Sequence, residues 1–258
     1  VRGVRAGKEY KMNLDLKIVL PVVIAFCISV VLCPIVIPFL KKLKFGQFVR
    51  DDGPQAHLKK AGTPTMGGLI ILLSLTITTL IYMKKYPDVL PVLFVTLGFG
   101  LIGFIDDYIK VVMKRSMGLH AWQKMLGQIV VTGVFAYYVE KYSDINNELI
   151  IPFLGKTVQL NSTLYVILLF FIVLGTVNGA NFTDGLDGLA SSVTVLIATF
   201  FAVVAVGTDS SVAPVACAAV GCLLGCLVYN VYPAKVFMGD TGSLALGGFV
   251  ASTAYMLK

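Results

Sequence analysis

Eight long apolar stretches run through this chain, and they constrain its fold more than any other feature. A stretch of about 20 apolar residues can cross the hydrocarbon core of a membrane as a helix. The composition agrees, since 57% of the 258 residues are hydrophobic and only 14% are charged, whereas soluble domains carry about 25% charged residues. We therefore predict an all-α polytopic membrane protein with about eight transmembrane helices. The stretches are 18–40, 66–83, 89–105, 125–140, 163–178, 190–206, 212–231 and 241–257.

The positive charges between these stretches predict the orientation of the chain. Cytoplasmic loops of membrane proteins carry an excess of Lys and Arg. The odd-numbered loops hold 11 such residues and the even-numbered loops hold four, so we place the odd-numbered loops in the cytoplasm. The net charge of +7 fits basic loops beside anionic headgroups better than a nucleic-acid site, and we expect no nucleic-acid partner.

Two segments outside the spans have features of their own. Residues 1–11 are basic although they precede the first span on the external side, and Met12 reads as a natural start. We expect residues 1–11 to be a tag or non-native extension and residues 12–258 to form a single transmembrane domain. Residues 144–162 hold two short β-prone runs about a Gly-Lys turn, which predict a small external β-hairpin.

The acidic residues indicate where the chemistry takes place, because a charge at membrane depth is costly and usually functional. Seven of the 14 Asp and Glu residues fall in the loops predicted to be cytoplasmic. We therefore predict a site on the cytoplasmic face. The seven are Asp51, Asp52, Asp106, Asp107, Asp184, Asp187 and Asp240.

The first polar motif joins Asp106 and Asp107 at the end of the third span. Adjacent carboxylates repel each other unless a cation neutralises them, so we expect a divalent ion or a proton-transfer role here. Asp106 can also pair with Lys110, four residues further along a helix. The alternative for this motif alone is a salt bridge at a helix end.

The second polar motif covers residues 178–189, with a polar side chain at every third position. These side chains are Asn178, Asn181, Asp184 and Asp187. In a helical turn they would share one stripe, and the neighbouring glycines would let a ligand approach the backbone. The alternative is a polar turn that only joins two spans.

The third and fourth motifs, residues 236–243 and 57–68, point to an anionic ligand. In the third, we expect Thr241 or Ser243 to cap a helix whose amino terminus attracts phosphate, beside a Mg²⁺ held by Asp240. The fourth offers cations, hydroxyls and the Gly67–Gly68 pair. The alternatives are a plain helix cap and a basic membrane anchor. Together, four motifs on one face favour a site for a metal and a phosphorylated ligand.

These motifs closely resemble those of the bacterial phospho-N-acetylmuramoyl-pentapeptide transferase family, within the polyprenyl-phosphate N-acetylhexosamine-1-phosphate transferase superfamily. The likeness runs in order over about residues 13–258. The resemblance implies that undecaprenyl phosphate attacks the β-phosphate of UDP-MurNAc-pentapeptide, giving lipid I and UMP in peptidoglycan synthesis, with Mg²⁺ required. Phosphoryl transfer depends on positioning and charge neutralisation, which such motifs supply.

The resemblance also implies roles for single residues. Asp106, Asp107 and Asp240 would be catalytic, Asp240 and Asp107 would bind the metal, and Phe237 would stack on the nucleotide base. The other nucleotide-binding residues it implies are Lys60, Lys114, Asn181, Asp184, Gly185, Leu186, Asp187 and Asn230. It places three more residues in the site: Thr65, Lys110 and Asn178.

The resemblance further implies a multi-pass protein of the bacterial plasma membrane, with the active site on the cytoplasmic face. It implies a homodimer, contacts with membrane lipid and inhibition by nucleoside antibiotics. Family members have ten spans and a triple-histidine motif in their last cytoplasmic loop. We therefore expect the C-terminal part of the transferase domain to lie beyond residue 258.

Two other functions stay open at this point. A sister transferase would move GlcNAc-1-phosphate instead of phospho-MurNAc-pentapeptide. An ion-coupled transporter would also carry intramembrane acids, but here the acids gather on one face and no inverted half-repeat is visible.

Overall fold

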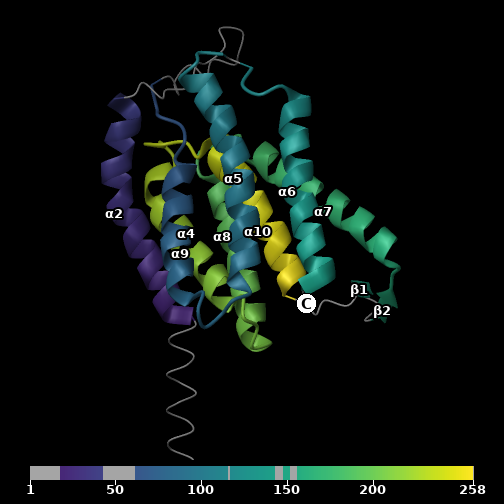
Figure 1. The fold of residues 1–258 in the computed structure, drawn as a ribbon. Coiled ribbons are helices and arrows are strands. Elements are labelled where there is room, and N and C mark those ends of the chain that lie inside the picture. The colour runs from purple at the N-terminus through teal and green to yellow at the C-terminus, as the bar shows by residue number, and fades with distance from the viewer. Residues whose placement is uncertain (1–17, 43–61, 116, 143–147, 152–155, 258) are drawn as a thin grey trace, which may run out of the picture.

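The computed structural model describes residues 18–42, 62–115, 117–142, 148–151 and 156–257 (Figure 1). Over these residues the chain is a bundle of eight helices, one for each predicted span, so the predicted all-α fold is confirmed. The helices are α2 (Leu20–Lys42), α4 (Gly68–Tyr82), α5 (Val89–Val111), α6 (Ala121–Tyr142), α7 (Ser162–Thr183), α8 (Leu189–Gly207), α9 (Ala213–Asn230) and α10 (Gly239–Met256).

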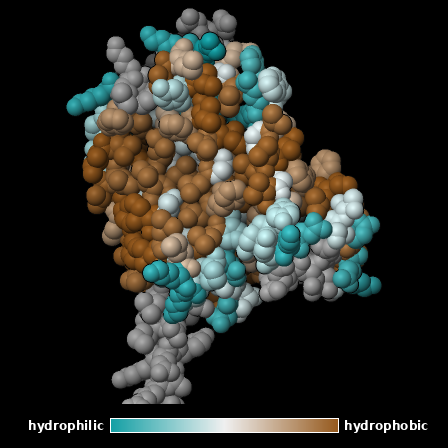
Figure 2. Space-filling view, in the orientation of Figure 1, coloured by the Kyte–Doolittle hydropathy of each residue, from teal (hydrophilic) through white to brown (hydrophobic). Residues whose placement is uncertain are grey.

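Five of the described helices are long and apolar enough to cross a membrane by length and composition: α2, α5, α7, α8 and α9. The outer surface of the bundle is accordingly brown in Figure 2, where hydrophobic residues cover most of the visible face. Helix α4 is shorter, with 15 residues. Helix α10 packs against α4, α5, α7 and α8, so it can carry buried hydroxyls such as Ser243, Ser252 and Thr253 without facing lipid.

Glycines let α10 lie unusually close to its neighbours. A methyl group on Gly68 of α4 would overlap the backbone of Gly242, and one on Gly103 of α5 would overlap the carbonyl group of Asp240. Backbone atoms cannot move aside as a flexible side chain can. The first turn of α10 is therefore held tightly between α4 and α5.

The predicted hairpin is present as an antiparallel pair, β1 (Glu148–Ile151) and β2 (Lys156–Gln159), in which Glu148 lies opposite Gln159. It directly precedes α7, at the end of the bundle where α7 begins (Figure 1). The side of the membrane on which it lies stays a prediction. The predicted extension at residues 1–11 lies outside the described residues.

Successive helices run in opposite directions, so every second loop emerges at the same end of the bundle. We call the end where α5, α7 and α9 finish and α6, α8 and α10 begin the site end; it is the upper end in Figure 1. The described parts of the loops predicted to be cytoplasmic belong to this end. The topology therefore brings the separate polar motifs together.

Candidate active site

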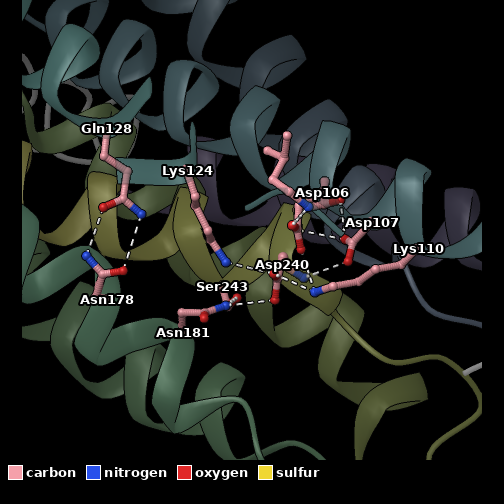
Figure 3. A network of polar contacts seen from close by, with 11 residues as sticks. Asp106, Asp107, Lys110, Lys124, Gln128, Asn178, Asn181, Asp240 and Ser243 are labelled. Carbon is pink, nitrogen blue, oxygen red and sulfur yellow. Dashed lines mark hydrogen bonds and ion pairs between the residues drawn. The ribbon is translucent and has the colours of Figure 1, made fainter. Parts of the chain in front are cut away.

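Three carboxylates meet at the site end, from the last turns of α5 and the first turn of α10 (Figure 3). One oxygen atom of each of Asp106, Asp107 and Asp240 lies within 4.8 Å of the others. Asp106 and Asp107 are only 2% and 4% exposed. Three like charges so close together, two of them buried, are unfavourable unless cations or hydrogen-bond donors compensate them.

Two lysines supply part of that compensation. The ammonium nitrogens of Lys110 on α5 and Lys124 on α6 lie 3.0 Å and 2.8 Å from the same oxygen, Oδ2 of Asp240. Lys110 also forms an ion pair with Asp106, as the spacing predicted. Among these five groups, three negative charges face two positive ones, so the cluster keeps a net attraction for a further cation.

Lys124 was missed by sequence reasoning. It stands just before a predicted span, where a basic residue also fits a membrane anchor, and nothing local distinguishes it from the other loop lysines. Its partner Asp240 is 116 residues further along the chain. Only the fold, in which α6 packs against α5 and α7, brings its ammonium group to the acidic cluster.

Asp107 makes its hydrogen bonds to the amino terminus of α10. Its Oδ1 accepts the backbone N–H of Asp240 at 3.2 Å. Its Oδ2 accepts the backbone N–H and the hydroxyl of Thr241, at 2.8 Å and 2.6 Å. The expectation that Thr241 or Ser243 caps α10 is therefore wrong. The helix begins at Gly239, earlier than predicted, so that both residues lie inside it.

Asn181 and Asn178 of α7 extend the network across the bundle, as Figure 3 shows. The amide of Asn181 donates to Oδ1 of Asp240 at 2.9 Å and to the hydroxyl of Ser243 at 2.8 Å. Asn178 exchanges two hydrogen bonds with Gln128 of α6, at 2.8 Å and 3.3 Å. Gln128 is 1% exposed and was also missed, although an amide within an apolar stretch was a usable signal.

The predicted polar stripe of residues 178–187 continues only as far as α7 does. The helix ends at Thr183, so Asp184 and Asp187 lie in the turn before α8. Oδ2 of Asp187 accepts the backbone N–H of Ala234 at 3.1 Å. This bond joins the turn at 184–188 to the loop at 231–238. Gly185 and Leu186 lie in the same turn, with the side chain of Leu186 exposed.

Asn230 is buried and holds the loop that precedes α10. Its amide donates to the carbonyl of Val236 at 2.9 Å, and its oxygen accepts the hydroxyl of Ser191 at 3.0 Å. The half-buried Phe237 follows in that loop. Asn230 was predicted to bind the nucleotide, and its observed bonds shape the Phe237 loop.

The Gly67–Gly68 pair also binds this loop through its backbone. The N–H groups of Gly67 and Gly68 donate to the carbonyls of Phe237 and Met238 at 2.8 Å and 2.9 Å, and Phe237 donates to the carbonyl of Pro64 at 2.8 Å. These N–H groups are therefore already used. The expectation that this pair serves an anionic ligand is not met.

Three predicted site residues remain: Thr65, Lys114 and Lys60. Thr65 is buried beside Gly239: a methyl group on Gly239 would lie 2.7 Å from the Thr65 hydroxyl. Lys114 is exposed in the segment that follows α5. That segment folds back, since the N–H of Leu119 donates to Oδ1 of Asp106 at 2.8 Å. Lys60 lies outside the described residues.

Comparisons with family models and with known proteins all indicate the same family. Residues 89–258 match the family model "Glycosyl transferase family 4", and residues 60–72 match "Phospho-N-acetylmuramoyl-pentapeptide-transferase signature 1". Three similar proteins bear the name phospho-N-acetylmuramoyl-pentapeptide-transferase. The protein from Caldicellulosiruptor bescii is 48% identical over 246 residues, which are 95% of this chain and 76% of that protein.

The other two show similar coverage. The Bacillus subtilis protein is 47% identical over 250 residues, with 95% of this chain and 76% of that protein covered. The Acetivibrio thermocellus protein is 48% identical over 257 residues, with 96% and 76% covered. Such identity over most of both chains, together with the signature at residues 60–72, shows that this chain belongs to the phospho-N-acetylmuramoyl-pentapeptide-transferase family.

Proposed function

We propose that the protein transfers phospho-MurNAc-pentapeptide from UDP-MurNAc-pentapeptide to undecaprenyl phosphate, giving lipid I and UMP. The observation that carries the proposal is the cluster of three carboxylates and two lysines at one end of an apolar helical bundle. A polyprenyl phosphate needs an apolar bundle beside it and a polar site at the membrane edge. A nucleotide sugar needs the same site to be open to water.

In this reaction an oxygen of the lipid phosphate forms a bond to the β-phosphorus of the nucleotide sugar. The bond from that phosphorus to the bridging oxygen breaks, and its electron pair leaves with UMP. Such a transfer is accelerated by holding the two phosphates in line and by neutralising their charge. Lys110 and Lys124 provide two positive charges at the place where Asp106 and Asp240 meet.

The donor set fits Mg²⁺, which prefers carboxylate oxygens and keeps several waters. Asp240 would hold the ion together with Asp106 and not with Asp107, which the resemblance implied. Both oxygens of Asp107 already accept hydrogen bonds from Asp240 and Thr241, whereas the buried Oδ2 of Asp106 has no hydrogen-bond donor besides its ion pair with Lys110. When bound, Mg²⁺ would neutralise the diphosphate of the substrate. Asn181 would keep the Asp240 carboxylate in place through its bond to Oδ1.

We place the nucleotide at the turn 184–188 and the loop 231–238. These segments are joined by the bond between Asp187 and Ala234, and they carry Leu186 and Phe237. The half-buried ring of Phe237 would stack on uracil, and the exposed Lys114 would contact the nucleotide phosphate. Uridine-containing antibiotics would compete for the same surface. We place the site end on the cytoplasmic face of the plasma membrane, and the homodimer stays a prediction.

Transfer assays with a radiolabelled donor test the proposal against its rivals. With UDP-MurNAc-pentapeptide and undecaprenyl phosphate, we expect a lipid-linked product that disappears when EDTA removes Mg²⁺. A sister transferase would instead label the lipid from UDP-GlcNAc. A transporter would give no lipid-linked product, and closed vesicles would accumulate its substrate.

A further inference from the structure

We propose that Asp107 is a positioning residue, which caps the amino terminus of α10 from α5 and so fixes the carboxylate of Asp240. Its effect on turnover rests on the proposed function, whereas its effect on the fold does not. The N-cap position of α10 is Met238, which forms no capping bond. The first N–H groups of a helix need acceptors, and a buried helix end without them is unfavourable.

Asp107 supplies those acceptors from another helix. It accepts the N–H groups of Asp240 and Thr241, the second and third residues of α10. A capping side chain normally accepts from these same two positions. The negative charge also lies at the positive end of the α10 dipole, where it is favourable. The hydroxyl of Thr241 adds a third donor, so the buried charge of Asp107 is well compensated.

The local backbone is built around this contact. Gly239 has φ +73°, and a methyl group there would lie 2.6 Å from Oδ2 of Asp107. On the other side, Gly103 lies one helical turn before Asp107 on α5, against the carbonyl of Asp240. Helix α5 therefore accepts the N–H of Asp240 through Asp107 and lies directly against the carbonyl of Asp240 at Gly103. With its backbone fixed, the Asp240 side chain is directed toward Asp106 and Lys110.

This role differs from that of a metal ligand in what it predicts for the metal-free protein. If Asp107 were held only for a metal, neutralising it would relieve repulsion within the acidic cluster and leave the melting temperature unchanged or higher. If Asp107 caps α10, Asp107→Asn replaces one acceptor by an N–H donor that faces other donors. The melting temperature in EDTA should then fall by roughly 5 °C.

Thr241 provides variants that alter no carboxylate. Thr241→Val removes only the hydroxyl donor to Asp107 and keeps the shape of the side chain, whereas Thr241→Ser keeps the donor. We expect Thr241→Val to lower kcat several-fold without changing KM for the UDP-substrate, and Thr241→Ser to restore kcat. In the double variant with Asp107→Asn, the losses in melting temperature should be less than additive, because both changes break one contact.

The deciding experiment measures melting in EDTA and turnover for Asp107→Asn and the Thr241 variants. A lower melting temperature of Asp107→Asn in EDTA, with a loss of turnover that Thr241→Val shares and Thr241→Ser does not, supports the capping role. An unchanged or higher melting temperature of Asp107→Asn in EDTA overturns it. The melting assay needs no substrate. If the wild-type protein made no lipid-linked product, the proposed function would fail while the melting result still decided the role of Asp107.

Discussion

Replacing Gly103 by alanine should force α5 away from α10 and disable the site. The added methyl group would overlap the carbonyl of Asp240 and would lie 2.7 Å from the backbone nitrogen of Thr241, whereas ordinary contacts begin at 3.4 Å. Since these are backbone atoms, the helices themselves must separate, by about 1 Å. Overpacking of this kind costs about 1–3 kcal/mol, which corresponds to a loss of roughly 2–12 °C in melting temperature.

The effect on turnover should be larger than the effect on stability. A misplacement of about 1 Å can cost about a hundredfold in rate, and the Asp240 carboxylate moves with the backbone that Gly103 touches. The assay measures kcat and the melting temperature of Gly103→Ala in the same detergent. The matched control is Gly175→Ala on α7, where an added methyl group meets nothing within 4 Å. Equal turnover and equal melting of the two variants would refute the reasoning.

Three further substitutions test single residues of the site. Asp240→Asn keeps the shape of the side chain but loses its charge, so turnover should vanish; activity within about tenfold of wild type, or 1.4 kcal/mol of barrier, would remove Asp240 from the metal site. Phe237→Ala should weaken binding of the UDP-substrate and of uridine-containing inhibitors by about 1–3 kcal/mol in calorimetric titrations, and a drop in melting temperature with normal affinity would contradict the stacking role. Lys124→Met removes the ammonium group 2.8 Å from Oδ2 of Asp240 and keeps the apolar stem, so kcat should fall at least about tenfold; wild-type kinetics would show that Lys124 is only an anchor.

The fold could be predicted from the sequence because membrane helices are recognisable as long, continuous apolar stretches. Even α10, which is rich in Gly, Ser and Thr, was found by its apolar residues. Its first turn was not, since Gly239 and Asp240 looked like a loop before the helix. What starts the helix there is an acceptor on α5, and no local pattern could show that Asp107 accepts its N–H groups.

The acidic residues of the site could be predicted from the sequence, whereas Lys124 was missed because a lysine at the end of a span is also explained as a membrane anchor. Asp106, Asp107 and Asp240 stood out because acids at membrane depth are costly, and the fold places them together. Lys124 did not stand out because basic residues at span ends are ordinary. The Gly67–Gly68 pair suggested a ligand, but its N–H groups bind the loop of Phe237. A motif alone does not show whether its donors face a ligand or another segment of the chain.

The leaving nucleotide tests the proposed reaction most directly. Transfer of a phospho-sugar breaks the bond between the two phosphates, so UMP leaves, whereas transfer of the sugar alone would release UDP. Chromatography of the nucleotides formed from UDP-MurNAc-pentapeptide, with the lipid-linked product counted in the same sample, distinguishes the two. We expect one UMP for each lipid-linked product, no UDP, and neither product after EDTA. Release of UDP in step with the lipid product would contradict the proposed reaction at the acidic cluster.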